Sequence, residues 1–476
     1  MASVNKKFIA LYYQLPYPLK VVVATLQGWH LRHWRYGPDT DRQAAEATER
    51  ETWSPKQWQA WQEERLGRLL HRAATRVPYY RVLWDKRRRQ GDRASWEYLE
   101  NWPILEKEPI RVHPRALVAD DCDTRKMYCL HTSGTSGFPL DIWWSRQTVR
   151  TWYAWFEARW RHWYGVSRHD RWAILGGALV APIQSRKPPF WVLNAAMNQL
   201  YMSSYHLAPD LISYYLEALE RYRITYLWGY TSSLYSLALE VLRRNRRDLR
   251  LKVAFPNAEP LYDYQKQAIA AAFHCPAPET YGMVEAVAAA GECRCGNLHL
   301  WPEVGIVEVM AHDRAAAPGE FGDFICTGLL NADMPLIRYR VGDRGALPAQ
   351  PVNCPCGRTL PLLAQVEGRI DDVILTPDGR RVGRLSPVWK ELPIREAQVI
   401  QEVRHKVRLR YIPAPEFTPA AQQEMVEKLR ARIGPMEVNL EPMEEIPRDA
   451  NGKFRSIVCK LPIMEKGEQG EPAGGQ

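Results

Sequence analysis

The chain has 476 residues, of which 46% are hydrophobic, and 64 basic against 54 acidic side chains give it a formal charge of +10. This length exceeds what one hydrophobic core usually supports, so we expect one large and one smaller domain, and the hydrophobic content excludes a disordered chain. The positive charge allows an anionic ligand, a nucleic acid or an acidic membrane surface as partner without choosing among them.

The N-terminal segment contains an apolar run that is too short to cross a membrane. Two prolines and Lys20 interrupt it before the roughly 20 apolar residues that a span needs, which also argues against a signal peptide. We therefore expect a cytoplasmic protein. Residues 19–34 can still form an amphipathic helix with Lys20, Arg32 and Arg35. We expect that helix to pack on its own domain, with peripheral membrane contact as the alternative.

Helices and strands are then predicted in chain order. Over residues 54–90 apolar side chains recur at helical spacing, and Pro78 should end that pattern because proline disfavours helix in the preceding residue. Over residues 128–341 short apolar runs alternate with longer helical patterns, which indicates a layered α/β domain. The predicted strands are 172–175, 226–228, 253–255 and 324–326, and the predicted helices are 211–222, 232–243 and 264–273.

Beyond residue 369 the pattern is typical of a small α+β domain. Its predicted elements are strands at 373–375 and 407–411, a turn at Asp378-Gly379 and a helix over 420–433. The expected organisation is a large domain over 1–369 with a helical leader over 1–120, a small domain over 370–464 and a disordered tail over 465–476.

A turn rich in hydroxyls and glycines, HTSGTSGFPL, occupies residues 131–140. Glycines let backbone amides approach an anion closely and the hydroxyls add donors, so this turn can hold a polyphosphate. It is not a Walker A loop, because no Lys-Ser/Thr pair follows the second glycine. Taken alone, it can also be an ordinary turn. The residues expected at phosphate are Thr132, Ser133, Gly134, Thr135, Ser136 and Gly137.

Five further motifs follow this turn in order: NAEPL at 257–261, YGMVE at 281–285, RYRVGD at 338–343, GRIDD at 368–372 and IPRDANGK at 446–453. Together with the turn they resemble the signature motifs of adenylate-forming enzymes, in the branch of phenylacetate-CoA ligases, coenzyme F390 synthetases and CapK-like proteins. The resemblance spans roughly residues 60–460. It implies a large layered α/β adenylation domain and a small mobile α+β C-terminal domain.

The function implied by this resemblance is that of an AMP-forming ligase. Such an enzyme uses ATP and Mg²⁺ to activate a carboxylic acid as an acyl-adenylate and then passes the acyl group to coenzyme A. The enzymatic alternatives are transfer of AMP itself, as in F390 synthetases, and an amine, hydroxyl or sugar acceptor, as in CapK-like proteins. The non-enzymatic alternative is a basic nucleic-acid or membrane-surface binding protein on a degenerate ligase scaffold. We expect no nucleic-acid partner, and a monomer or homodimer.

The nucleotide-binding residues implied by the resemblance surround the base and the ribose. Tyr281 offers a flat face to adenine, and Asp343 can accept hydrogen bonds from both ribose hydroxyls. The other residues implied at the base, the ribose or the phosphates are Asn257, Ala258, Glu259, Gly282 and Arg369.

Two residues are implied as catalytic. Glu285 would hold Mg²⁺, which prefers carboxylate and phosphate oxygens. Lys453 would bridge the attacking carboxylate and the α-phosphate, although a lysine in such a turn is by itself an ordinary surface residue. Asp371 fits the hinge about which the small domain would rotate. Phe138 stands where many relatives carry a lysine, so one phosphate contact is missing.

Five of the nine cysteines gather in two short clusters, CRCGNLH at 293–299 and CPCG at 354–357. This grouping favours a metal in a reducing compartment over a disulfide framework. Four thiols and an imidazole suit a closed tetrahedral zinc site, with scattered reduced thiols as the alternative. The resemblance implies a structural zinc knuckle with Cys295 as a spare thiol. Its implied ligands are Cys293, His299, Cys354 and Cys356.

The segment Trp228-Gly229-Tyr230 lies where the family places one wall of its acyl pocket. Aromatic side chains there imply an apolar or aromatic acid. Tryptophan and tyrosine are also common core residues, and the chain has 19 tryptophans. Further candidates for the same pocket are Phe190, Trp191, Asn194 and Asn198.

Overall fold

The structure is a computed structural model, and it describes residues 6–132, 140–178, 180–182, 184–311, 314–367, 373–382, 385, 388–389, 392–447 and 456–461. Several predicted residues lie outside these ranges. They are Ser133, Gly134, Thr135, Ser136 and Gly137 of the phosphate turn, Phe138, Arg369, Asp371 and Lys453, together with the predicted tail. None of the described helices is long and apolar enough to cross a membrane.

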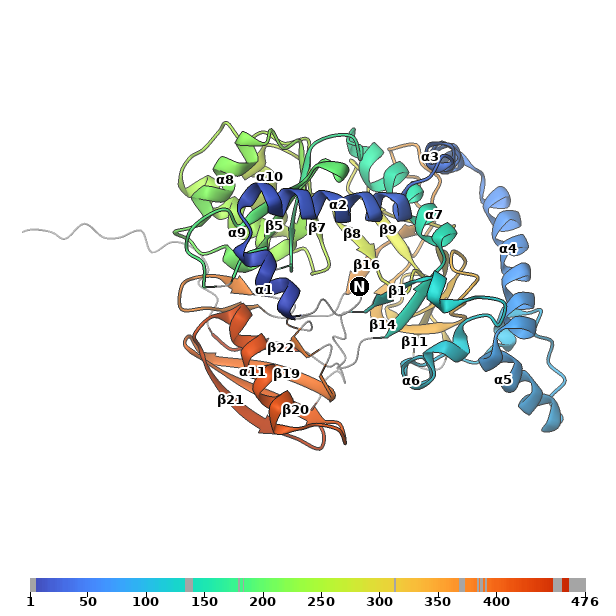
Figure 1. Ribbon diagram of the computed structural model, residues 1–476. Helices are drawn as coiled ribbons and strands as arrows, with labels where there is room; N and C mark the ends of the chain where they lie inside the picture. The colour runs from blue at the N-terminus through green and yellow to red at the C-terminus, as the bar shows by residue number, and fades with distance from the viewer. Residues whose placement is uncertain are drawn as a thin grey trace, which may run out of the picture.

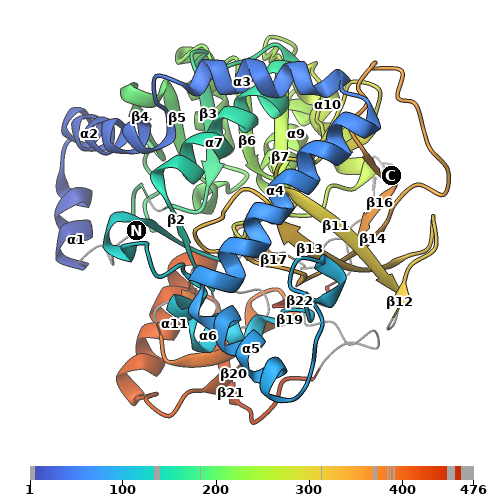
Figure 2. The same cartoon turned by 90° about the vertical axis from the view of Figure 1, so that its right-hand side faces the viewer.

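The N-terminal region is helical. Its helices are α1 (Lys6–Gln14), α2 (Tyr17–Arg35), α3 (Thr40–Glu49), α4 (Pro55–Arg76), α5 (Pro78–Arg89) and α6 (Lys107–Val112). Ser54 begins α4 with a capping box to Gln57. The predicted end of helix before Pro78 is confirmed for α4, because Val77 is extended. Pro78 then begins a new helix, α5, at a position where a proline loses no intrahelical hydrogen bond. Figure 2 shows α4 running diagonally across one face of the molecule.

A five-stranded sheet has the strand order β4-β5-β3-β6-β7, and several of the predicted site residues lie at the carboxyl ends of its strands. Its strands are β3 (Trp172–Gly176), β4 (Trp191–Asn194), β5 (Gln199–Ser203), β6 (Tyr226–Tyr230) and β7 (Val253–Asn257). β4 is antiparallel to β5 and the other neighbours are parallel. Ligands of such sheets bind outside the carboxyl ends of the parallel strands. The three strands predicted in this region are confirmed.

Helices α8 (Ile212–Arg221), α9 (Thr231–Arg243) and α10 (Asp263–Phe273) confirm the three predicted helices. They bury apolar side chains against this sheet, in a core that contains Leu216, Leu227 and Ile269. A second, aromatic core contains Trp160, which follows α7 (Arg146–Phe156), together with Trp228 of β6. The sheet is therefore held between an aliphatic and an aromatic layer.

Two antiparallel sheets follow, of which the sequence predicted a single strand, 324–326. The first has the order β15-β10-β9-β8 and the second the order β12-β11-β13-β14-β16. Their strands are β8 (Thr280–Gly282), β9 (Ala289–Glu292), β10 (Leu298–Leu300), β11 (Gly305–Ala311), β12 (Arg314–Ala315), β13 (Gly322–Gly328), β14 (Tyr339–Ala346), β15 (Leu362–Leu363) and β16 (Gln365–Glu367). A hairpin of β1 (Tyr128–His131) and β2 (Asp141–Trp144) flanks the phosphate turn.

The C-terminal part forms a sheet of its own, with the order β21-β20-β19-β22, drawn in orange and red in Figure 1. Its elements are β19 (Ile394–Val403), β20 (Lys406–Pro413), α11 (Pro419–Ile433), β21 (Glu437–Pro442) and β22 (Ile457–Cys459). The predicted helix and the strand at 407–411 are confirmed, and β17 (Ile374–Leu375) pairs with β18 (Arg381–Val382) around the predicted turn. Arg380, between β17 and β18, donates to the carbonyl of Tyr205 at 2.7 Å, in the turn that follows β5 of the five-stranded sheet.

Candidate functional site

The end of β7 is tied to β6 by the Asn257 carboxamide. Oriented so that both its polar atoms are paired, the amide accepts a hydrogen bond from Trp228 Nε1 at 2.6 Å and donates one to the Gly229 carbonyl at 3.0 Å. Ala258, the next residue, has a φ of 63°, which residues with a side chain seldom adopt. Such strain is often found at functional sites. The Glu259 carboxylate then accepts from the Ser232 amide at 2.7 Å, in the first turn of α9.

Tyr281 and Asp343, predicted at the base and the ribose, lie side by side although β8 and β14 belong to different sheets. The Tyr281 hydroxyl donates to Asp343 Oδ2 at 3.1 Å. The Thr280 hydroxyl donates to the Pro256 carbonyl at 2.9 Å, which keeps β8 beside the end of β7. Those of the residues predicted around base and ribose that the structure describes therefore come together at the carboxyl edge of the parallel sheet.

Glu285 is buried, with 8% of its surface exposed, and its carboxylate accepts a hydrogen bond from the Tyr339 hydroxyl at 3.1 Å. A buried carboxylate is costly without donors or a cation, so Tyr339 stabilises Glu285 and a divalent cation would stabilise it further. Sequence reasoning missed Tyr339, although it lies inside the RYRVGD motif. We refer to one group of residues as the nucleotide edge: Asn257, Ala258, Glu259, Tyr281, Glu285 and Asp343.

Two other residues predicted to bind the nucleotide, Thr132 and Gly282, have surroundings that ordinary packing and turn geometry explain. Thr132 follows β1 at the entrance of the phosphate turn, where its hydroxyl accepts from the Leu140 amide at 2.8 Å and so closes the base of the turn. A methyl group added at Gly282 would meet Trp160 and Trp152 at ordinary contact distances, so nothing in the described structure requires glycine there.

Trp228 and Tyr230 of β6 differ in exposure. Trp228 is buried in the aromatic core against Phe255, with ring centroids 4.7 Å apart, whereas Tyr230 is half-buried at the end of the strand. The hydroxyls of Tyr230 and Tyr205 gather over Gly177, where a β-carbon would lie 2.9 and 3.3 Å from them. Burial also raises the pKa of nearby Tyr201. Sequence reasoning named Tyr230 but missed Tyr205 and Tyr201, because only the fold brings the strand ends together.

The prediction that Asn194 and Asn198 line the acyl pocket is wrong. β4 runs antiparallel to β5, so Asn194 pairs with Gln199 at the amino end of the parallel strands. Tyr230 lies at the other end of the sheet, where β6 ends. Asn198 adjoins the same end. Phe190 lies at the other end of β4 but is fully buried, and its ring stacks on His206 at 4.9 Å. Strand direction, which the sequence did not reveal, accounts for the error.

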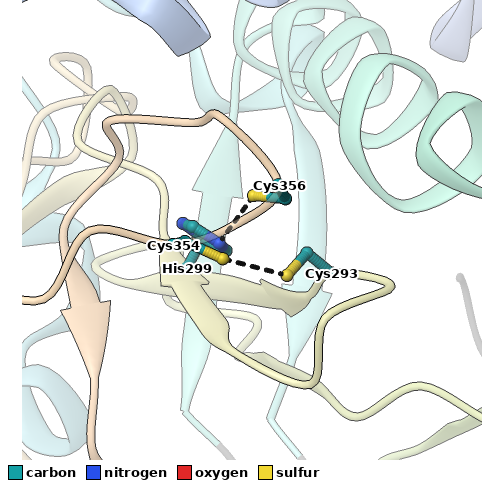
Figure 3. Close-up of side chains that lie close together, drawn as sticks. All are labelled: Cys293, His299, Cys354 and Cys356. Atoms are coloured by element: carbon teal, nitrogen blue, oxygen red, sulfur yellow. Dashed lines mark hydrogen bonds between the residues drawn. The ribbon is translucent and has the colours of Figure 1, made fainter.

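The four predicted metal ligands converge, and Figure 3 shows them facing one another. One ligand atom from each lies within 4.8 Å of the others, in a group that we call the metal corner: Cys293, His299, Cys354 and Cys356. The Cys293 and Cys354 sulfurs are 3.6 Å apart, and Cys356 Sγ is 3.5 Å from His299 Nε2. Tetrahedral zinc requires separations of about 3.8 and about 3.6 Å for these two pairs, from the usual zinc–sulfur and zinc–nitrogen distances.

Hydrogen bonds from neighbouring groups orient these side chains, and burial sets their protonation states. His299 Nδ1 lies 3.3 Å from the Leu360 carbonyl, which leaves Nε2 for the metal, and Asn297 donates to the Cys354 sulfur at 3.2 Å. Burial lowers the pKa of His299 to about 4, so the imidazole is neutral at pH 7. Burial raises the pKa of Cys293 to about 12. A bound cation would reverse that effect and remove the thiol proton.

The metal corner joins two separate segments. Cys293 and His299 belong to the β9–β10 hairpin, and the other two ligands belong to the loop between β14 and β15. Gly296 and Gly357 have φ angles of 82° and 79°, which let each cysteine turn close tightly. Cys295 is exposed, as expected of a spare thiol. All four ligand positions are filled by protein, so the arrangement suits a structural metal.

A second group of metal-ligating types lies on the β1–β2 hairpin: Cys129, His131 and Asp141. His131 and Asp141 are cross-strand partners, and His131 Nδ1 lies 2.6 Å from Asp141 Oδ1. All three residues are partly exposed, and the imidazole and carboxylate already satisfy each other. The group is therefore explained as a polar pair with a neighbouring thiol at the base of the phosphate turn.

Comparison with known proteins points in one direction. Residues 374–460 match the family model of the CapK C-terminal domain. The chain is similar to protein CapK of Staphylococcus aureus, with 26% identity over 277 residues that cover 58% of this chain and 60% of that protein, so less than two thirds of that relative is spanned. It is also similar to the phenylacetate-coenzyme A ligase of Thermus thermophilus, with 24% identity over 458 residues, 86% of this chain and 98% of that one.

Among solved structures, the fold is similar to that of 2-hydroxyisobutyryl-CoA ligase in complex with 2-HIB-AMP and CoA. The TM-score is 0.55 at 19% identity, over 86% of this chain and 92% of that one. The chain therefore has the α/β fold of adenylate-forming enzymes, as the order of its motifs predicted.

Proposed function

We propose that the chain is an AMP-forming ligase of the CapK and phenylacetate-CoA ligase branch of the adenylate-forming superfamily, which activates a carboxylic acid with ATP and transfers the acyl group to coenzyme A. The observation that carries the proposal is the contact of Tyr281 with Asp343 beside the strained turn at Ala258. These groups come from separate sheets, yet together they offer a ring face for a base and a carboxylate for a ribose.

The catalytic roles follow from the same arrangement. Glu285, nearly buried and stabilised by Tyr339, would hold Mg²⁺ at the phosphates. Lys453 would neutralise the repulsion between the attacking carboxylate and the α-phosphate. We also propose that the chain divides near residue 369 into two domains and that the smaller one rotates about Asp371, which would bring Lys453 to the nucleotide and withdraw it afterwards.

The acid pocket is assigned to the end of β6. Tyr230 and Tyr205 place two hydroxyls over Gly177, and Trp228 supplies an apolar wall behind them. A site with aromatic walls and phenol groups suits an aromatic or apolar acid that also carries a hydrogen-bonding group. We assign zinc to the metal corner, where it would join the β9–β10 hairpin to the loop after β14 without taking part in the reaction.

A panel of aromatic and aliphatic carboxylic acids, screened by ATP–pyrophosphate exchange, tests the first half-reaction. In Lys453→Ala, exchange should fall by about 100-fold or more while ATP affinity stays within about threefold, because the ammonium acts mainly on the transition state. Lys460→Ala is the matched control: Lys460 forms an exposed pair with Glu402 at 2.9 Å and should leave exchange unchanged.

Two results would overturn this assignment. Equal loss of exchange and ATP affinity would mean that Lys453 only binds the nucleotide. Tight binding of ATP without exchange for any acid would favour a binding protein on a ligase scaffold.

The match of residues 374–460 to the CapK C-terminal domain favours a second candidate for the second half-reaction. In that version an amine, a hydroxyl or a sugar accepts the acyl group in place of coenzyme A. The rate of AMP release from preformed acyl-adenylate, measured with each acceptor in turn, distinguishes coenzyme A from the other acceptors. Acceleration by coenzyme A supports the thioester, whereas acceleration by amines or sugars alone supports the other acceptor.

A further inference from the structure

The N-terminal helices carry an apolar stripe that no other part of the described chain covers. Five large hydrophobic side chains are exposed between residues 11 and 29, by 49 to 65%: Leu11, Leu19, Val22, Leu26 and Trp29. Four of them recur at spacings of three and four residues along α2, so they form one continuous stripe. Elsewhere in the described chain such side chains come singly or in pairs.

A different face of α2 fixes the helix on the protein. The Tyr17 and Tyr222 hydroxyls lie 2.8 Å apart, and Arg32 donates to the Ala196 carbonyl at 3.2 Å. Gly28 is buried, and a β-carbon there would lie 1.9 Å from Asn194 Oδ1, so the helix packs as closely as a glycine allows. The stripe is thus held outward, and Figure 2 shows α1 and α2 at one margin of the molecule.

The charge along the N-terminal helices themselves is of one sign. Residues 1–38 contain five basic side chains and no acidic one, although acidic residues are common in the rest of the chain. His30 and His33 are also exposed on α2. A second copy of the chain docked through the same stripe would bring two basic segments together. An anionic surface would instead pair with them.

We propose that the stripe from Leu19 to Trp29 on α2 docks the protein on a bilayer that contains anionic lipids, with the helix lying in the plane of the headgroups. Exposed leucine, valine and tryptophan side chains beside basic residues are the composition of helices that bind in this way. The helix is not both long and apolar enough to span the bilayer, so the proposed attachment is peripheral and reversible. This inference does not depend on the proposed ligase activity.

Sedimentation of the full chain with vesicles tests the proposal. Vesicles of phosphatidylcholine with roughly 30% phosphatidylglycerol should bind about 10-fold more protein than pure phosphatidylcholine, and 0.5 M salt should remove most of the difference. The variant Leu26→Ser/Trp29→Ser should bind anionic vesicles about 10-fold more weakly. Leu239→Ser/Leu242→Ser on α9, exposed by 39 and 44%, is the matched control and should bind as the parent chain does.

Folding is monitored separately, by the thermal midpoint and by ATP binding, neither of which the stripe variant should change. Because the salt dependence is measured on the unaltered chain, it tests the proposal even if a variant folds poorly. Equal sedimentation with both vesicle types would overturn the proposal. So would a dimer in solution that the stripe variant converts to a monomer, because the stripe would then belong to a second copy.

Discussion

The metal corner and the nucleotide edge both gather polar side chains from distant segments, but they hold them differently. At the metal corner the ligands face one another, three of them buried, and nothing remains for an outside molecule to bind. At the nucleotide edge hydrogen bonds such as that between Tyr281 and Asp343 hold groups that, apart from the buried Glu285, stay partly or fully exposed. The first arrangement should contribute stability and the second should contribute ligand affinity, so substitutions should separate the two effects.

Cys354→Ser should have the largest effect, and it should be on stability. The serine cannot replace the thiolate, so the proposed zinc should be lost and the loop after β14 should be freed from the β9–β10 hairpin. Loss of a structural metal is among the few single changes that cost more than about 4 kcal/mol, and we expect the unfolding midpoint to fall by about 5 °C or more. Differential scanning fluorimetry and zinc analysis of the same samples measure both quantities.

Cys295→Ser is the control for that comparison. Cys295 lies in the same turn as Cys293 but is exposed and outside the metal corner, so both zinc content and midpoint should stay unchanged. If Cys354→Ser kept its zinc, the ligand set would be wrong. If it lost zinc at an unchanged midpoint, the metal would have no structural role.

Asp343→Asn should have a smaller effect, and it should be on nucleotide affinity. The amide keeps an oxygen for the Tyr281 hydroxyl, so the fold is preserved, but the charge that strengthens hydrogen bonds to ribose is gone. A hydrogen bond to a charged group contributes about 1.5–3 kcal/mol, which predicts ATP affinity at least about 10-fold weaker. Isothermal titration with ATP measures this, and the thermal midpoint of the free protein should not move.

Asp323→Asn provides the matched variant. Asp323 lies on the neighbouring strand β13 and pairs with Arg340 and Arg344 at 3.0 and 3.3 Å, both partly exposed. Exposed pairs contribute little, so neither ATP affinity nor the midpoint should change by much. Unchanged ATP affinity in Asp343→Asn would remove that residue from the ribose site and weaken the contrast between the two regions.

The sequence predicted best those features whose pattern is local. Buried parallel strands such as β6 and β7 are recognisable as short apolar runs between helical patterns. The spacing of the two cysteine clusters likewise indicated the metal corner. β19 was missed because its buried residues include Glu396, Gln398 and Gln401, which hide the hydrophobic period of a strand. Gln401 is fully buried and bonds to the Leu375 amide and carbonyl at 2.8 and 2.7 Å, a tertiary contact without a local signal.

At the candidate site the motifs identified residues but not their relations. The RYRVGD motif drew attention to Asp343, whereas the role of Tyr339 depends on the meeting of β14 with the segment after β8. Asn194 was misplaced because the direction of β4 was unknown, and that direction is likewise a property of strand pairing. Sequence reasoning therefore named all six residues of the nucleotide edge, whose roles are proposals, but could not say which neighbours support them.

Tyr339→Phe should have the smallest effect of the three, and it tests that support directly. Removing the hydroxyl leaves the ring in the core, so the chain should fold normally, but Glu285 loses its donor and becomes less well positioned. We expect a loss of about 1 kcal/mol, or roughly fivefold, in the Mg²⁺ dependence of adenylation. Tyr226→Phe, which removes a hydroxyl bonded to the Ser167 carbonyl at the opposite end of the sheet, should leave that dependence unchanged. Equal effects of the two variants would mean that the hydroxyl of Tyr339 only supports packing, and Glu285 would then have to be positioned by the metal itself.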